Sequence, residues 1–198
     1  MENLNNNENI DKKEISKEIQ KDRKKKRFLH SLFKETLEWC FYIVICLTLA
    51  ILINNTLIIN ANVPTGSMEN TIPTKSRLFG NRLSYINKNP ERGDIVIFWA
   101  PEEDNILYVK RVIGMPNDVV EIKNGILYIN GETYEEDYIK DMNGDYGPYK
   151  VPNDSYFVLG DNRNNSHDAR YWRNPYITKD DIIAKAIIMY WPRIEILK

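Results

Sequence analysis

Ser67 is the residue of this chain whose type and surroundings best suit a nucleophile. It lies in the sequence VPTGSMEN, where Pro64 and Gly66 favour a tight turn that exposes the serine hydroxyl and backbone N–H. Thr65, two residues earlier, would place a second hydroxyl on the same side. A serine followed by glutamate is also common at helix starts. Ser67 is therefore either a candidate nucleophile or a helix cap.

A nucleophilic serine needs a base, which is most often a histidine. The chain has two histidines, and His30 precedes a long apolar segment that would place it out of reach. His167 is flanked by Ser166 and Asp168, whose side chains would point away from it in extended backbone. These neighbours cannot complete a triad, but a triad of His167 with Ser67 and a distant acid stays open.

Lys110 is the other candidate base. A lysine with its usual pKa of about 10.4 is charged and cannot accept a proton, whereas burial can neutralise it. Lys110 lies in the apolar sequence LYVKRVIG, and the adjacent Arg111 would point to the opposite face of a strand. The pattern fits a buried, neutral lysine, and it fits equally well an exposed lysine on an edge strand.

An apolar segment, LEWCFYIVICLTLAILINNTLII, occupies residues 37–59 and carries one charge, Glu38. This length is sufficient to span the hydrocarbon of a membrane as a helix. A cleavable signal peptide would be shorter, nearer the N-terminus and followed by a small-residue cut site. We therefore expect one uncleaved transmembrane anchor. Asn54 and Asn55 interrupt the run, so a buried core helix is the alternative.

Basic residues precede this segment in the sequence KDRKKKR at 21–27. Cytoplasmic flanks of membrane helices carry an excess of Lys and Arg. The expected organisation is a cytoplasmic basic tail at 1–36, the anchor at 37–59 and an extracytoplasmic catalytic β domain at 60–198. Residues 1–20, rich in Asn, Lys and Glu, are expected to form a solvated tail or a frayed helix.

The residues beyond the anchor have the composition of strands rather than helices. Asn124-Gly125 between two β-branched runs is a strong hairpin signal, and Asn130-Gly131 marks a further turn. The expected fold is mainly β, a single antiparallel β domain behind one N-terminal transmembrane helix, with a helical turn near Ser67. Strands are predicted at 94–99, 106–112, 119–123, 126–129, 156–159 and 182–191.

Composition excludes several classes of function. The net charge is −1, and most of the clustered Lys and Arg lie before residue 35, so a nucleic-acid partner is not expected. Cys40 and Cys46 both lie in the apolar run, which leaves no disulfide framework or zinc site. The acidic clusters at 102–104 and 135–137 lack the ligand spacing of a calcium site and are interpreted as solvated loops. No metal or cofactor is expected.

Four ordered sequence blocks carry a family resemblance: PTGSM at 64–68, RGDIVIF at 92–98, YVKRVIGMPND at 108–118 and GDNRNNSHDAR at 160–170. Together with the single N-terminal anchor, they make the chain similar to the type I signal peptidases, from about residue 35 to its end. Asn70 and Ala169 stand where that family commonly has proline and serine.

This resemblance implies a membrane-bound serine endopeptidase of the bacterial plasma membrane that removes signal peptides from exported preproteins, cutting at Ala-x-Ala sites. The implied partners are these signal peptides and membrane lipid. Ser67 would be the nucleophile and Lys110 its base, and the peptide would add as a strand near 61–66 and 107–110. The implied supporting residues are Thr65 as an oxyanion donor, Ser166 as the group that orients the lysine, and Asp161, Arg163, Asp168 and Arg170 as a polar framework.

Two alternatives share this fold and stay open. One is a non-catalytic accessory protein, which would be expected to lack Ser67 or Lys110, although both are present. The other is a self-cleaving Ser/Lys protease, which would be soluble rather than anchored.

Overall fold

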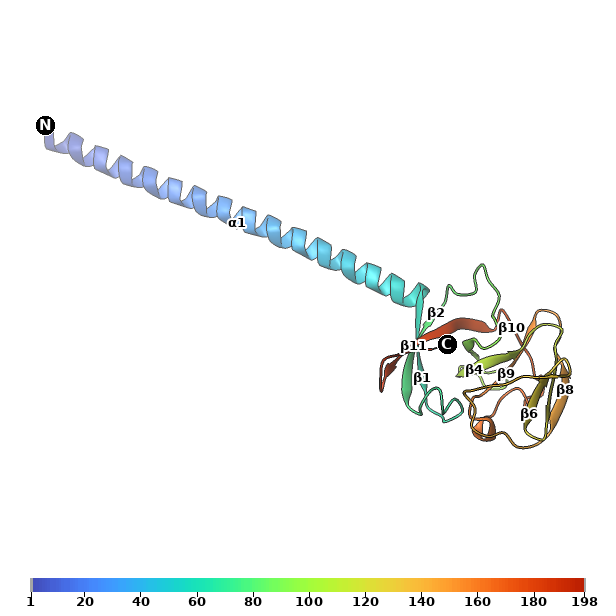
Figure 1. Cartoon of the computed structure of the whole chain (residues 1–198). Helices are drawn as coiled ribbons and strands as arrows, with labels where there is room; N and C mark the ends of the chain where they lie inside the picture. Colours follow the sequence, from blue (N-terminus) through green and yellow to red (C-terminus); the bar gives the residue numbers. More distant parts are fainter. Residues whose placement is uncertain (1, 198) are drawn as a thin grey trace. The chain divides into compact units, whose positions relative to one another are not determined.

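The computed structural model describes residues 2–197, with side chains described at 23–26, 30 and 32–197. The chain divides into two units, Met1–Leu52 and Ile53–Lys198. Figure 1 shows the single long helix, α1, and the strands of the second unit.

The helix α1 runs from Glu2 to Thr56 and so includes residues that were predicted as a solvated tail or a frayed helix. Its part Leu32–Thr56 is long and apolar enough to cross a membrane, and its side chains are not buried within the protein. The alternative of a buried core helix is therefore wrong. The predicted end at residue 59 is also wrong, because Ile58 and Ile59 begin a strand.

The second unit is mainly antiparallel β, as predicted. Its larger sheet has eight strands within the described residues, in the order β1-β2-β11-β3-β4-β9-β10, with β12 paired to β11. The bounds are β1 Ile58–Val63, β2 Ser76–Asn81, β3 Ile95–Trp99, β4 Leu107–Gly114, β9 Ser155–Leu159, β10 Ile177–Thr178, β11 Ile182–Trp191 and β12 Glu195–Ile196.

The smaller sheet has the order β7-β6-β5-β8. The strands β5 (Val119–Lys123) and β6 (Ile126–Ile129) have the predicted bounds, and Asn124 and Gly125 form the turn between them with positive φ. The strand β7 is Glu132–Thr133, and β8 is Tyr146–Lys150. A short 3-10 helix, η1 (Arg163–Asn165), follows β9.

Two hydrophobic clusters hold these sheets in place. One joins the two sheets, since it contains Val112 of β4, Val120 of β5 and Phe157 of β9. The other packs β1, β2 and β11 against the turn that follows β1, and Met68 and Ile72 of that turn are fully buried in it. The turn that carries Ser67 is thus anchored to the core by the buried side chains of Met68 and Ile72.

Candidate active site

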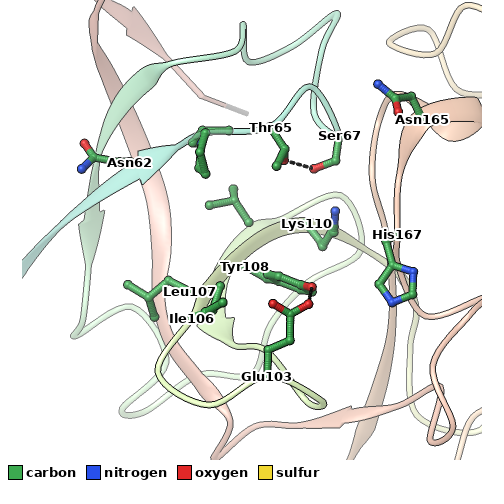
Figure 2. A pocket seen from close by; sticks show the side chains of 13 residues that line it. Asn62, Thr65, Ser67, Glu103, Ile106, Leu107, Tyr108, Lys110, Asn165 and His167 are labelled. Carbon is green, nitrogen blue, oxygen red and sulfur yellow. Dashed lines mark hydrogen bonds between the residues drawn. The ribbon is translucent and has the colours of Figure 1, made fainter.

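A pocket of about 450 Å³ lies where three segments of the chain meet. The end of β1 and the following turn contribute Asn62 to Thr65 and Ser67, the start of β4 contributes Leu107 to Lys110, and the loop after η1 contributes His167. Figure 2 shows Ser67 and Lys110 on facing walls of this pocket, with the Lys110 nitrogen directed toward the Ser67 side. The structure therefore brings the predicted nucleophile and base to one cavity.

Ser67 begins a tight turn, as predicted. The Glu69 N–H donates to the Gly66 carbonyl over 3.1 Å, and the Ile72 N–H donates to the Met68 carbonyl over 2.7 Å. The hydroxyl of Thr65 donates to Ser67 Oγ over 3.4 Å. Ser67 Oγ is thus the acceptor of that contact, and its own proton is available to a base.

Asn162 holds this turn in place and was given no role by the sequence reasoning. Its backbone N–H donates to the Ser67 carbonyl over 3.0 Å, and its side-chain Nδ2 donates to the Gly66 carbonyl over 3.0 Å. The two bonds fix the peptide units on either side of Ser67. The only signal in the sequence was the position of Asn162 within the block at 160–170.

Lys110 is buried, with 4 % of its surface exposed. It lies on β4 opposite Val96 of β3, and its burial makes the alternative of an exposed lysine wrong. Burial lowers the pKa of its amine from 10.5 to about 8, because a charged amine is poorly solvated there. Asp168 and Asp161 oppose this lowering and Arg170 adds to it. At neutral pH the unprotonated fraction of this amine is therefore much larger than that of an ordinary lysine.

Ser166 is hydrogen-bonded to this amine. Lys110 Nζ donates to Ser166 Oγ over 3.1 Å, and both residues are buried. One N–H direction of the amine is thereby fixed. The resemblance assigned this role to Ser166, and the structure brings the two groups together.

Asp161 and Arg111 form a buried ion pair on the other side of the turn. Arg111 Nε and Nη2 donate to the two carboxylate oxygens of Asp161 over 2.9 and 2.7 Å. The Thr71 hydroxyl donates to Asp161 Oδ2 over 2.5 Å. The pair thus joins β4, the loop after β9 and the turn of the nucleophile. Arg111 was predicted only to point away from Lys110, and its ion pair was missed.

Asp168 and Arg170 form a second buried pair. Arg170 Nε and Nη2 donate to Asp168 Oδ1 and Oδ2 over 2.8 and 2.9 Å. The Gly160 N–H also donates to Asp168 Oδ2, over 3.1 Å. Arg170 further donates to the carbonyl of Arg163 over 2.6 Å, and Arg163 Nε donates to the Gly160 carbonyl over 3.0 Å. The predicted polar framework therefore fixes the loop that starts at Gly160.

Gly160 is a second residue that the sequence reasoning left without a role. A Cβ placed there would lie 2.4 Å from the Ser67 carbonyl oxygen and 2.2 Å from Ser166 Oγ. Such distances are far shorter than real contacts, so only glycine lets the loop approach both residues.

His167 lies at the edge of the pocket and is exposed. Its ring stacks on Tyr171 with a centroid distance of 5.9 Å and an interplanar angle of 16°. The adjacent acid, Asp168, binds Arg170 instead. This arrangement agrees with the expectation that the neighbours of His167 do not complete a triad.

Asn70 follows the nucleophile at a position where proline is common in the family that this sequence resembles. Its φ is 99°, in the left-handed region, whereas a proline ring holds φ near −65°. The turn after Ser67 therefore takes a path that proline could not follow. Ala169, at the other departure, is fully buried.

Comparisons with known proteins place the chain among signal peptidases. The family model described as "Signal peptidase, peptidase S26" matches residues 36–191. The chain is 39 % identical over 178 residues to signal peptidase I S of Bacillus subtilis, covering 83 % of this chain and 94 % of that protein. It is 41 % identical over 167 residues to signal peptidase I P of Bacillus subtilis subsp. natto, covering 79 % and 89 %.

Two further relatives match over a shorter span. A probable signal peptidase I-2 of a Synechocystis species is 39 % identical over 136 residues, which is 66 % of this chain and 62 % of that protein's length. The crystal structure of a signal peptidase I from Enterococcus faecalis is 31 % identical, with a TM-score of 0.42, and covers 50 % of this chain and 97 % of that one. On the match of the family model and of the two Bacillus relatives, the chain belongs to the type I signal peptidase family.

Proposed function

We propose that this protein is a membrane-anchored serine endopeptidase that removes signal peptides from exported preproteins, with Ser67 as nucleophile and Lys110 as general base. The observation that carries this proposal is the buried amine of Lys110, which has a lowered pKa and shares one pocket with Ser67. A lysine with these properties is suited to accept a proton near neutral pH.

In the proposed reaction, Ser67 Oγ attacks the scissile carbonyl carbon while neutral Lys110 Nζ takes the hydroxyl proton. The Ser67 N–H and the Thr65 hydroxyl stabilise the oxyanion that forms. Lys110 then gives its proton to the leaving amine as the C–N bond breaks, which leaves an ester on Ser67. Water hydrolyses this ester with Lys110 again acting as base, and the Ser67 hydroxyl is restored.

The preprotein is proposed to bind as an added strand between β1 and β4. Support comes from the sheet register: β1 is an edge strand, and β9 pairs with β4 from Arg111 onward, so one edge of Leu107–Lys110 is open in the described register. Val63, Leu107 and Val109 line the pocket with apolar surface. Shallow apolar pockets favour small side chains, consistent with an Ala-x-Ala site.

Cleavage of a preprotein with an Ala-x-Ala site by the full-length protein in detergent tests this function. Wild type is expected to cut after the second alanine, and Ser67→Ala is expected to abolish cutting. Ser84→Ala, a half-buried serine of the loop between β2 and β3, is the matched control and should cut normally. An inactive but folded wild type would favour the accessory protein, whereas cleavage of its own chain alone would favour the self-cleaving protease.

The proposed topology places the N-terminus in the cytoplasm and the β domain outside a bacterial plasma membrane. Its basis is the apolar stretch Leu32–Thr56 and the basic residues at 21–27 before it. Protease added outside intact spheroplasts is expected to degrade the β domain. A domain that is degraded only after lysis would reverse the orientation.

A further inference from the structure

Glu136 lies in the loop that joins β7 to β8, within an acidic run that was interpreted as a solvated loop. That interpretation is wrong for this residue, because its side chain is 1 % exposed, whereas Glu135 and Asp137 beside it are exposed. A buried carboxylate is costly unless charged or hydrogen-bonding groups surround it. The groups that contact Glu136 must therefore offset the cost of burying its charge.

Arg163 of η1 is the charged partner of Glu136. Its Nη2 lies 2.5 Å from Glu136 Oε1, and its side chain is fully buried. The Tyr138 hydroxyl donates to the same Glu136 oxygen. The loop makes a second contact with η1, because the Asn143 N–H donates to the Asn164 side chain over 3.0 Å. The loop of the smaller sheet is thus bound to η1 through a buried ion pair.

This ion pair leads directly to the active site. Arg163 Nε donates to the carbonyl of Gly160, the residue that lies tightly against Ser67 and Ser166. The orientation of the Arg163 guanidinium is set by Glu136 at one end and by Gly160 at the other. A change at Glu136 is therefore transmitted to the loop that presents Ser166 to Lys110.

The same segment supports the second buried arginine. The guanidinium of Arg111 lies 4.0 Å from the centroid of the Tyr138 ring, a favourable contact between a cation and an aromatic face. Arg111 holds Asp161, and Asp161 holds Thr71 of the nucleophile turn. Glu136 and Tyr138 together contact the arginines that order both sides of the active site.

We propose that Glu136 is a positioning residue for peptide-bond hydrolysis. Its carboxylate fixes Arg163, and Arg163 in turn holds the loop at 160–166 so that Ser166 orients the Lys110 amine. This inference rests on the proposed Ser67/Lys110 function. Without the carboxylate, the Arg163 guanidinium loses its buried counter-charge, the loop relaxes, and water reaches Lys110.

The test compares Glu136→Gln with the control Glu135→Gln, which removes an exposed carboxylate one residue away. Both are assayed as full-length protein in detergent, with kcat, KM and the pH dependence of kcat/KM on an Ala-x-Ala substrate. For Glu136→Gln we expect kcat to fall by about ten- to a hundredfold with little change in KM, since small misplacements of catalytic groups have effects of this size. We also expect the limb along which kcat/KM rises with pH to move to higher pH, because hydration raises the pKa of Lys110.

A purely structural role for Glu136 would lower the folded fraction but leave the kcat of the folded enzyme and its pH limb unchanged, and this result would overturn the inference. If Glu136→Gln does not fold, Tyr138→Phe tests the inference in its place. This variant removes only the hydroxyl that donates a hydrogen bond to Glu136, and it keeps the ring that contacts Arg111. It should shift the limb in the same direction, and an unshifted limb would again overturn the inference. Absence of cleavage by both wild type and Glu135→Gln would instead remove the proposed function.

Discussion

Replacing Lys110 with methionine is expected to abolish catalysis and to make the protein more stable. Loss of the general base should lower kcat/KM by at least about a thousandfold. The lowered pKa of Lys110, about 8 instead of 10.5, corresponds to a cost of about 3 kcal/mol for holding its charged amine in the folded protein. Methionine removes this cost, and the lost Ser166 hydrogen bond offsets about 1 kcal/mol. The expected net gain is therefore about 2 kcal/mol.

The gain in stability of Lys110→Met should be largest below pH 8 and should shrink as the pH rises above it. Below pH 8 the amine is charged in both the folded and the unfolded protein, so wild type bears the full cost. Between pH 8 and 10.5 the folded protein has lost the proton while the unfolded chain retains it, and the advantage of the methionine variant should shrink. Urea unfolding in detergent, followed by tryptophan fluorescence, measures this difference. A methionine variant less stable than wild type at pH 7 would contradict the cost assigned to Lys110.

Lys110→Arg is the companion variant for the same position. Guanidinium stays protonated at any accessible pH and cannot act as a base, so this variant should also be inactive. Unlike methionine, it keeps a buried positive charge and should not gain stability. An active arginine variant would remove the proposed role of Lys110.

Replacing Gly160 with alanine is expected to have the largest effect of any change outside the proposed Ser67/Lys110 pair. The added Cβ would overlap the Ser67 carbonyl oxygen and Ser166 Oγ, so the loop must move away from both. Such a shift separates the group that orients Lys110 from the turn of the nucleophile. A fall in kcat of about a hundredfold or more is expected, with a smaller effect on KM.

Gly131→Ala is the control for this variant. Gly131 has a φ of +86°, and nothing lies within 4 Å of a Cβ added there. Alanine at this position strains the backbone and should lower stability without changing kcat. If Gly160→Ala lowers stability as Gly131→Ala does but retains normal kcat, the tight contact at Gly160 has no role in catalysis.

Local patterns predicted the parts of the fold that depend on neighbouring residues. The hairpin around Asn124-Gly125 was predicted to its exact bounds because the turn residues and the flanking β-branched runs agree. The strand β1 was missed, because Ile58 and Ile59 continue an apolar run and only their pairing with Asn81 and Gly80 makes them part of a strand. The strand β8 was also missed, because it contains glycine and proline, which oppose strand formation. Such residues are tolerated at the edge of a sheet, where β8 lies.

The residues of the candidate site also fall into those that local sequence could predict and those that it could not. Ser67 and Lys110 could be proposed from their local surroundings and from the family resemblance. The burial of Lys110 could not be predicted in this way, because it depends on β3 and on Ser166, which are distant in the sequence. Glu136 was misinterpreted because its partner, Arg163, lies 27 residues away, and an acidic run is usually solvated. Asn162 and Gly160 act through backbone contacts that residue type does not reveal.

The most direct test of the Ser67/Lys110 pair is to change the basicity of the amine at position 110 and follow the pH dependence of kcat/KM. Lys110→Cys is made in a chain that also carries Cys40→Ala and Cys46→Ala, since both native thiols are exposed on α1. Aminoethylation of the introduced thiol in the unfolded protein, followed by refolding, yields a lysine analogue whose sulfur makes the amine less basic. A protein that keeps Lys110 and passes through the same steps is the control.

The account predicts that kcat/KM of the control rises with pH along a single limb with its midpoint near pH 8, because the unprotonated amine is the active form. Before modification, the Lys110→Cys protein should be inactive, and aminoethylation should restore cleavage with the limb at lower pH. His167→Ala should leave the limb of the control in place. A limb that does not move with the analogue, or one that disappears in His167→Ala, would contradict Lys110 as the base and point to His167.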